Sequence, residues 1–185
     1  MRFNNHAKLE GLHAPFSPSQ SSWLRYDDSK AIEVLTNMRA KEKGTRLHAW
    51  AKETIDLGLR QPRSDKTLYA YVNDAIGYRM DTEVVLFYSE RFFGTADAIS
   101  FKKNFLRIHD LKTGKSKVSM DQLEIYAALF CLEYGYKPDS IQIELRIYQN
   151  DKVIVHVPEP EDILQIMDHI EYLDKALSDY EKEGV

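Results

Sequence analysis

The chain has 185 residues, of which 43% are hydrophobic and 29% charged, and its formal net charge is −4. This composition is that of one soluble globular domain with a full-sized core, predicted to span residues 1–185. No apolar run approaches the roughly 20 residues of a membrane span, and the N-terminus has no apolar signal core. The single cysteine, Cys131, excludes an internal disulfide and fits a reducing cytoplasm. A cytoplasmic protein without a membrane partner is therefore expected.

The first third of the chain predicts three helices. Ser17-Pro18-Ser19-Gln20 is typical of a helix start, and Asp28 or Ser29 is predicted to cap a second helix. Gly44 opens a third, whose apolar residues recur at helical spacing until Gly58: Leu47, Trp50, Ala51, Ile55 and Leu59. His48 lies at the margin of that apolar face, where a histidine is most often a core residue.

The middle of the chain predicts a loop, a helix and a β-meander. Residues 61–65 form the loop, and the aromatic segment up to 81 is expected to pack as a helix against a sheet. A strand is predicted over 83–88, with Glu83 at its start. Two further runs, 92–101 and 104–111, are rich in aromatic and β-branched residues and are joined by a short polar link. They indicate a β-hairpin.

The hairpin carries Asp97 among apolar neighbours and ends in Asp110-Leu111-Lys112. Strand side chains alternate, so Asp110 and Lys112 are expected on one face and Leu111 in packing. Carboxylates are the oxygen ligands that Mg²⁺ and Mn²⁺ prefer, and a lysine beside a metal-bound water can orient it or offset charge on a phosphate. The alternative is a hairpin with a surface salt bridge from Asp110 to Lys112.

The last part of the chain predicts a helix, two strands and a final helix. The first helix runs from about 119 to 134, with Gln122 and Tyr126 on one face. A half-buried strand over 141–147 pairs with 153–157, and an amphipathic helix follows 162. The order of elements predicts an α/β fold: a central mixed β-sheet flanked by α-helices.

Basic residues concentrate beside the predicted hairpin. Six lie between 102 and 117, with one acid among them: Lys102, Lys103, Arg107, Lys112, Lys115 and Lys117. A phosphate backbone would be drawn to such a patch, although Lys102 and Lys103 fit a solvated hairpin tip better. The segment Thr113-Gly114-Lys115-Ser116 is not a phosphate loop, because His109 stands where that pattern needs a glycine. No bound nucleotide is expected.

Three motifs in order resemble the PD-(D/E)XK nuclease superfamily. They are Gly94-Thr95-Ala96-Asp97, Asp110-Leu111-Lys112-Thr113-Gly114, and Gln122 with Tyr126. The resemblance covers about 17 to 150, is strongest to the RecB-like exonuclease branch, and extends to Gly44 and His48 on an upstream helix. It implies a restriction-endonuclease-like core. Because small stand-alone members occur in phages, it also implies that the protein acts in the cytoplasm of a bacterial or phage-infected cell. The iron–sulfur cluster of some relatives is excluded, since it needs four thiolates.

The resemblance implies a metal-dependent deoxyribonuclease, most plainly an exonuclease acting in DNA recombination, repair or degradation. Asp97 and Asp110 would bind Mg²⁺ or Mn²⁺, with His48 and the Leu111 carbonyl as further ligands. Glu83 would brace the metal, or is an exposed strand-start acid. The implied catalytic set is Asp97, Asp110, Lys112, Gln122 and Tyr126, with DNA attracted by Lys115, Lys117 and Arg107. The alternatives are a non-catalytic nucleic-acid- or protein-binding module, or a subunit of a larger recombination complex; a homo-oligomer is compatible with either.

Overall fold

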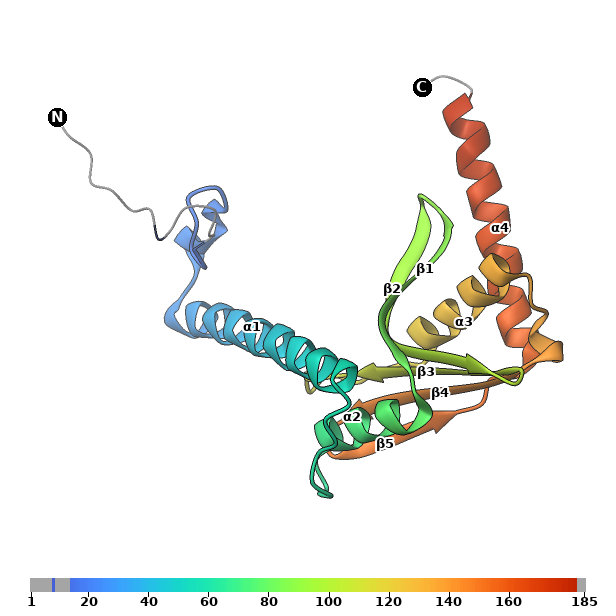
Figure 1. Ribbon diagram of the computed structural model, residues 1–185. Helices are drawn as coiled ribbons and strands as arrows, with labels where there is room; N and C mark the ends of the chain where they lie inside the picture. The colour runs from blue at the N-terminus through green and yellow to red at the C-terminus, as the bar shows by residue number, and fades with distance from the viewer. Residues whose placement is uncertain (1–7, 9–13, 183–185) are drawn as a thin grey trace. The chain divides into compact units, whose positions relative to one another are not determined.

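The computed structural model describes residue 8 and residues 14–182 (Figure 1). Its internal contacts divide the chain into two compact units, Met1–Arg46 and Leu47–Val185, and the single domain over residues 1–185 stays a prediction. The boundary falls inside one long helix. The sheet and all the candidate site residues belong to the second unit. Within the described ranges, no helix has both the length and the apolar character that crossing a bilayer requires.

The first unit differs from the sequence prediction in three places. Where a helix was expected from Ser17, the chain forms turns and a short 3-10 helix, η2 (Ser21–Arg25), and the Trp23 indole donates to the Ser17 carbonyl at 2.9 Å. The cap of the next helix is Asp27, whose Oδ1 accepts from the Lys30 backbone N–H at 2.7 Å. That helix, α1 (Asp28–Asp56), continues through Gly44. A glycine costs a helix only about 1 kcal/mol, too little to break one of this length.

The second unit is built on a five-stranded sheet of order β1-β2-β3-β4-β5. The strands are β1 (Asp81–Ser89), β2 (Phe92–Lys102), β3 (Phe105–Leu111), β4 (Gln142–Gln149) and β5 (Lys152–His156). All neighbours are antiparallel except β3 and β4, which are parallel because α3 (Asp121–Tyr134) connects them. The prediction of a mixed sheet flanked by helices is confirmed.

The predicted hairpin is β2 and β3. Its turn residues, Lys103 and Asn104, have φ of 53° and 59°. The β4–β5 turn is similar, since Asn150 and Asp151 have φ of 50° and 57°. Two adjacent residues at positive φ make a type I′ turn, whose twist matches that of the strands. Lys102 donates to the Tyr78 and Arg79 carbonyls at 3.1 and 2.9 Å, so it caps a helix.

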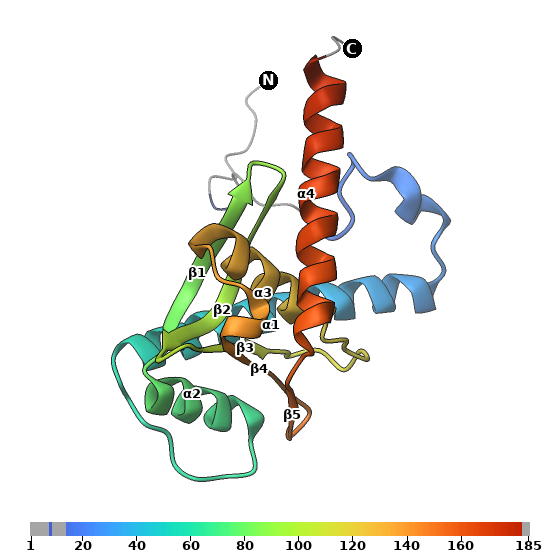
Figure 2. The same ribbon diagram turned by 90° about the vertical axis from the view of Figure 1, so that its right-hand side faces the viewer.

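Helices cover both faces of the sheet (Figures 1 and 2). On one face, α3 and α4 (Pro160–Lys182) pack on alternate residues of the central strands, including Leu106, Ile108, Leu145 and Ile147. On the other face, α2 (Thr67–Tyr78) and the last turns of α1 bury a second cluster around Leu111 and Tyr148. The ends of β2 and β3 therefore lie between two cores, which fixes the backbone at the candidate site.

Polar side chains of β4 that were predicted to face solvent lie instead beneath α2. Arg146 pairs with Glu144 at 3.0 Å and with Asp74 of α2 at 3.1 Å. The Tyr148 hydroxyl donates to Asp74 at 2.6 Å and lies 3.2 Å from His109 Nδ1. Since the hydroxyl has one proton, the His109 Nδ1 must carry a hydrogen and donate to it. Burial and the two nearby arginines lower the pKa of His109 to about 3, so the ring is neutral.

Candidate catalytic site

The site lies where β2 and β3 separate. Their main-chain pairing ends at Ala98 and His109. One step further, the Asp97 carboxylate replaces the missing main-chain partner and accepts the Leu111 N–H at 3.1 Å. The Leu111 side chain is buried in the second core, as predicted. This arrangement brings Asp97 and Asp110 close together, because each strand delivers its carboxylate at the point of separation.

Asp110 is an almost fully buried carboxylate with 4% of its surface exposed. Its Oδ1 accepts from Lys112 Nζ at 3.1 Å, and its Oδ2 has no hydrogen-bond partner in the described part of the chain. Burial raises the pKa of Asp110, and the charge of Asp97 raises it further, while Lys112 opposes the shift. The site therefore holds more negative charge than Lys112 alone compensates.

His48 lies against the other acid. Its Nδ1 is 3.4 Å from Asp97 Oδ2, and its side chain is about one-third exposed, so it is not a core residue. The hydrogen bond to Asp97 raises the pKa of His48, burial opposes the shift, and Asp110 and Glu83 contribute further attraction. An imidazole beside two carboxylates is a common ligand set, but the role of His48 as a ligand stays a prediction.

Glu83 stands opposite Asp97, between the pairs Thr82–Ala98 and Val84–Ala96. Its φ is 53°, although it lies inside a strand. A non-glycine residue at positive φ is uncommon and costs of order 1–3 kcal/mol, and such strain concentrates at functional sites. The strain and the acid charge at this position favour a role for Glu83 at the site over a plain strand-start acid.

Lys112 connects the acids to α3. Its Nζ donates to Gln122 Oε1 at 2.7 Å, and Gln122 Nε2 donates to the Tyr126 hydroxyl at 3.2 Å. The Gln122 side chain is not used to cap the start of α3, because no side chain caps that helix at its N-cap residue, Met120. A Cβ added at Gly94 would lie 2.8 Å from Tyr126 Cε1, so only glycine lets the ring lie against β2. Three motifs distant in sequence thus form one chain of contacts.

The predicted DNA-attracting residues lie in two different environments. Lys115 and Lys117 are exposed on the loop between β3 and α3, which Gln149 holds by donating to the Gly114 and Ser116 carbonyls at 2.7 and 3.0 Å. Arg107 lies on the face that α2 covers, 3.4 Å from Glu144 and stacked on the Phe105 ring. The lysines are free to meet a phosphate backbone, whereas Arg107 is committed to packing.

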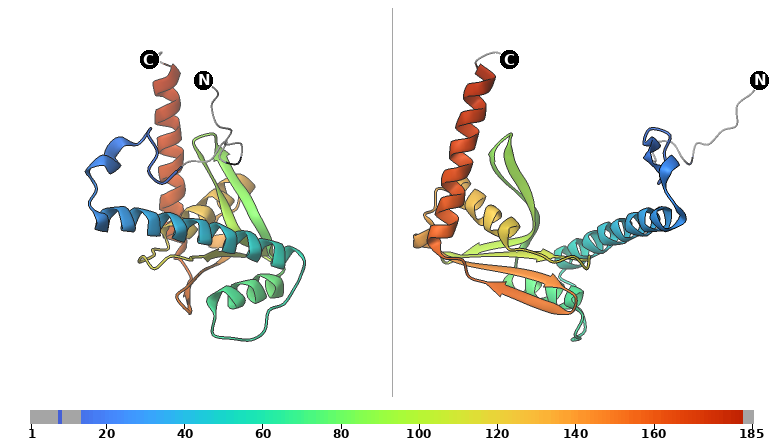
Figure 3. Two further views of the ribbon diagram at one scale, coloured as in Figure 1. Left: turned by 90° about the vertical axis from the view of Figure 1, so that its left-hand side faces the viewer. Right: turned by 180° about the vertical axis from the view of Figure 1, so that it is seen from behind.

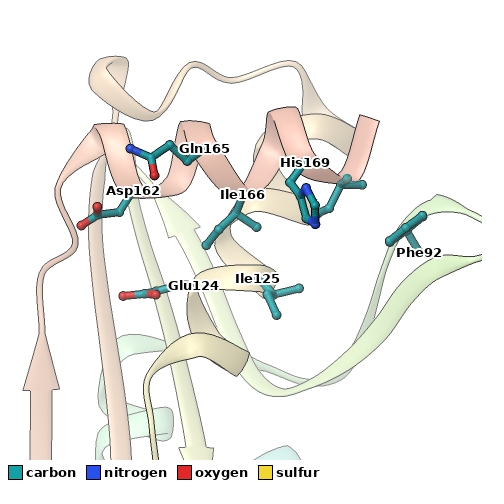
Figure 4. Close-up of a pocket in the computed structure, with 8 residues that line it drawn as sticks. Phe92, Glu124, Ile125, Asp162, Gln165, Ile166 and His169 are labelled. Carbon is teal, nitrogen blue, oxygen red and sulfur yellow. The ribbon is translucent and has the colours of Figure 1, made fainter. Parts of the chain in front are cut away.

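A cavity of about 590 Å³ lies elsewhere, between α3, α4 and the start of β2 (Figure 4). Apolar side chains such as Ile125, Ile166 and Phe92 line it together with Glu124 and His169. Glu124 is engaged, because it pairs with His156 at 2.9 Å. The candidate-site carboxylates, Asp97, Asp110 and Glu83, do not line this cavity, so it is separate from the candidate site.

The fit of the site residues to a divalent cation rests on their donor atoms. Among residue 8 and residues 14–182, no three His, Cys, Asp or Glu side chains are arranged as a preformed metal centre. The carboxylates nevertheless suit one: carboxylate oxygens are the ligands that Mg²⁺ and Mn²⁺ prefer, and the buried Asp110 Oδ2 has no other partner among the described residues. A cation at that oxygen would offset the excess negative charge of Asp97 and Asp110.

Comparisons with models of protein families, with curated proteins and with solved structures found no match to this chain.

Sequence analysis missed two supporting residues, Gln149 and Tyr148. Gln149 holds the lysine loop, and the Tyr148 carbonyl accepts the Lys112 N–H at 3.0 Å. The available signal was their position after Ile147, at the end of the strand that runs parallel to β3.

Proposed function

We propose that this protein is a metal-dependent deoxyribonuclease, most directly an exonuclease, of the RecB-like branch of the PD-(D/E)XK superfamily. The proposal includes a restriction-endonuclease-like core within the mixed sheet. The observation that carries it is Lys112, which bridges Asp110 and Gln122 beside Asp97 where β2 and β3 separate. A surface salt bridge would not need a buried carboxylate with one oxygen unpartnered.

Each residue of the site has a chemical role in this proposal. Asp97 and Asp110 would hold Mg²⁺ or Mn²⁺, with His48, the Leu111 carbonyl and Glu83 as supporting groups. When bound, such a cation lowers the pKa of a water molecule and offsets negative charge on the scissile phosphate.

Lys112 is the ammonium that can donate to the attacking water or to a phosphate oxygen. Its two existing bonds, to Asp110 and Gln122, fix where the third donor points. Gln122 and Tyr126 present an amide and a hydroxyl from one face of α3, and they would hold the sugar–phosphate strand in line. Lys115 and Lys117 would attract the backbone without reading its sequence.

A second candidate is a non-catalytic nucleic-acid- or protein-binding module, or a subunit of a larger recombination complex. One observation favours it: the described residues contain no preformed three-ligand metal centre. Such a module would retain the fold and the loop that carries Lys115 and Lys117, but it would not cleave DNA.

Digestion of end-labelled DNA by the purified chain separates the two. The enzyme is expected to cut in Mg²⁺ or Mn²⁺, to stop in excess chelator, and to bind without turnover in Ca²⁺. Asp110→Asn should remove activity, whereas the matched change Asp139→Asn, at an exposed acid remote from the site, should not. Undiminished cutting in excess chelator, or equal cutting by Asp110→Asn, would contradict the proposal.

A further inference from the structure

The β1–β2 hairpin exposes an apolar surface on one side. We call it the hairpin platform, and it consists of Val85, Phe87 and Phe93, which are 54%, 46% and 59% exposed. Phe87 and Phe93 are directly paired across the two strands, and their ring centroids are 6.5 Å apart. Two adjacent, half-exposed phenylalanines form a continuous aromatic surface rather than scattered apolar residues.

The opposite side of the same hairpin is packed. Leu86 is buried there, and Val84 and Phe92 pack against the core that α3 and α4 complete. Figure 1 and the right-hand view of Figure 3 show both helices on that side of the hairpin. The platform residues therefore alternate with core residues, so that they cannot turn inward without exposing Leu86.

The hairpin is also held in place. Arg91 lies in the turn between β1 and β2 and donates to Asp174 at 2.8 Å and to Ser178 at 3.2 Å, both on α4. Ser89, at the end of β1, donates to Asp174 at 2.7 Å. The backbone N–H of Phe87 donates to Glu133 of α3 at 2.8 Å. The platform is thus a preformed surface, and a ligand would meet it without the cost of ordering the hairpin.

The platform is continuous with the candidate catalytic site. The exposed alternate positions of β1 include Glu83, which stands opposite Asp97, and continue through Val85 to Phe87. Along β2, Phe93 is four residues from Asp97, a distance of about 13 Å along an extended strand. A nucleic-acid strand with its phosphate at Asp97 can therefore reach the rings with its neighbouring bases.

We propose that the hairpin platform stacks unpaired bases of the strand that enters the catalytic site, which makes single-stranded DNA or a frayed duplex end the substrate. The proposal rests on the proposed nuclease function and adds the form of its substrate. Every base has a π face, so stacking on Phe87 and Phe93 selects unpaired bases without selecting sequence. A base pair within a duplex offers no free face. A protein partner or a second copy is the competing occupant, but neither would account for the continuity with Asp97.

The test uses the full chain and a double variant, Phe87→Leu with Phe93→Leu. Binding of a short fluorescent single strand in Ca²⁺ is expected to weaken by roughly fivefold to 150-fold, the change that one stacked base supplies. A strand of the same length with abasic residues should bind wild type and variant equally. The matched control, Tyr172→Leu with Tyr180→Leu, removes two exposed rings on α4 and should leave binding unchanged. In wild type, 2-aminopurine near the strand end should lose fluorescence on binding.

The contrary results are distinct. If wild type cuts DNA but the platform variant binds the normal strand equally well, the platform proposal falls and the nuclease proposal stands. If wild type neither binds nor cuts any DNA, the nuclease proposal falls and this one falls with it. If the variant changes only the sedimentation of the protein, the platform is a protein interface and stacking is refuted. A thermal melt checks that each variant is folded, and the 2-aminopurine signal tests wild type directly.

Discussion

Replacing Asp110 by asparagine is expected to stabilise the cation-free protein while removing its activity. The Asp110 carboxylate is almost fully buried, its Oδ2 has no partner among the described residues, and Asp97 adds a second negative charge beside it. An asparagine has the same shape and no charge. Its amide oxygen can still accept the hydrogen bond from Lys112.

The size of the effect follows from two opposing contributions. Removing the charge relieves its burial and its repulsion from Asp97, while the partly exposed pair with Lys112 returns at most about 1 kcal/mol. The unpartnered atom itself is not removed, because the asparagine amide nitrogen takes the place of Oδ2. The net gain on substitution is therefore small, on the order of 1 kcal/mol, or roughly 2–4 °C in Tm for a chain of this size.

The pH dependence has a definite sign. Because folding raises the pKa of Asp110, the folded protein holds its proton at a higher pH than the unfolded chain does. Wild type should thus lose stability as the pH rises from the ordinary aspartate value of 3.8 through the raised one. Asp110→Asn has no carboxyl group at this position, so its stability should not fall in this way.

Thermal melting in EDTA and in Mn²⁺ measures both parts. Mn²⁺ is expected to raise the Tm of wild type and to leave Asp110→Asn unchanged, since the ligand is lost. Asp97→Ala is the control: it removes the acceptor of the buried Leu111 N–H and should lower the Tm in EDTA. The reasoning is refuted if Asp110→Asn melts below wild type in EDTA, or if Mn²⁺ shifts both proteins equally.

Three more predictions test other parts of the account. Gly94→Ala should force the Tyr126 ring off β2 and lower turnover, while the free energy of unfolding falls by only about 1–3 kcal/mol. Urea unfolding and single-turnover cleavage measure the two effects, and unchanged turnover would contradict a role for the Tyr126 position. Replacing Lys115 and Lys117 by alanine should weaken DNA binding and make its salt dependence shallower, with turnover at saturating DNA unchanged; an unaltered salt slope would exclude them from the interface. His109, with a pKa lowered to about 3, should cost about 2 kcal/mol of stability between pH 7 and 5, because the unfolded chain binds the proton that the folded one rejects. His109→Asn should flatten that slope in urea unfolding, and an unchanged slope refutes the buried neutral ring.

The sheet could be predicted from the sequence because its signals are local. Runs of aromatic and β-branched residues marked β2 and β3, and strict alternation of apolar and polar residues marked β4. The polar links between strands form turns with both central residues at positive φ. Helix boundaries were less predictable. Gly44 indicated a break, yet the helix continues through it, since one glycine costs less than the turns on either side contribute.

The candidate site was predictable in its members but not in its geometry. The motifs named Asp97, Asp110, Lys112, Gln122 and Tyr126, and the structure joins them by hydrogen bonds or a shared electrostatic environment. Their roles remain predictions. Spacing alone could not show that β2 and β3 separate at Asp97, because the end of a strand pair depends on tertiary contacts.

The polar residues beneath α2 show the same limit. Arg146 and Glu144 alternate with apolar residues and therefore predicted a solvent face, but α2 covers them and supplies Asp74 as a partner. Alternation identifies the two faces of a strand and does not show what packs on each.

The central claim is that this site cleaves DNA and does not merely bind it, and Lys112→Ala tests it most directly. Lys112 is assigned to the water and the scissile phosphate, so its loss should lower turnover rather than ground-state affinity. Single-turnover cleavage of labelled DNA in Mg²⁺, measured beside binding in Ca²⁺, is the decisive experiment. The account predicts that Lys112→Ala binds DNA nearly as well as wild type and does not cut it. Cutting at the wild-type rate would contradict the catalytic assignment and favour the binding module.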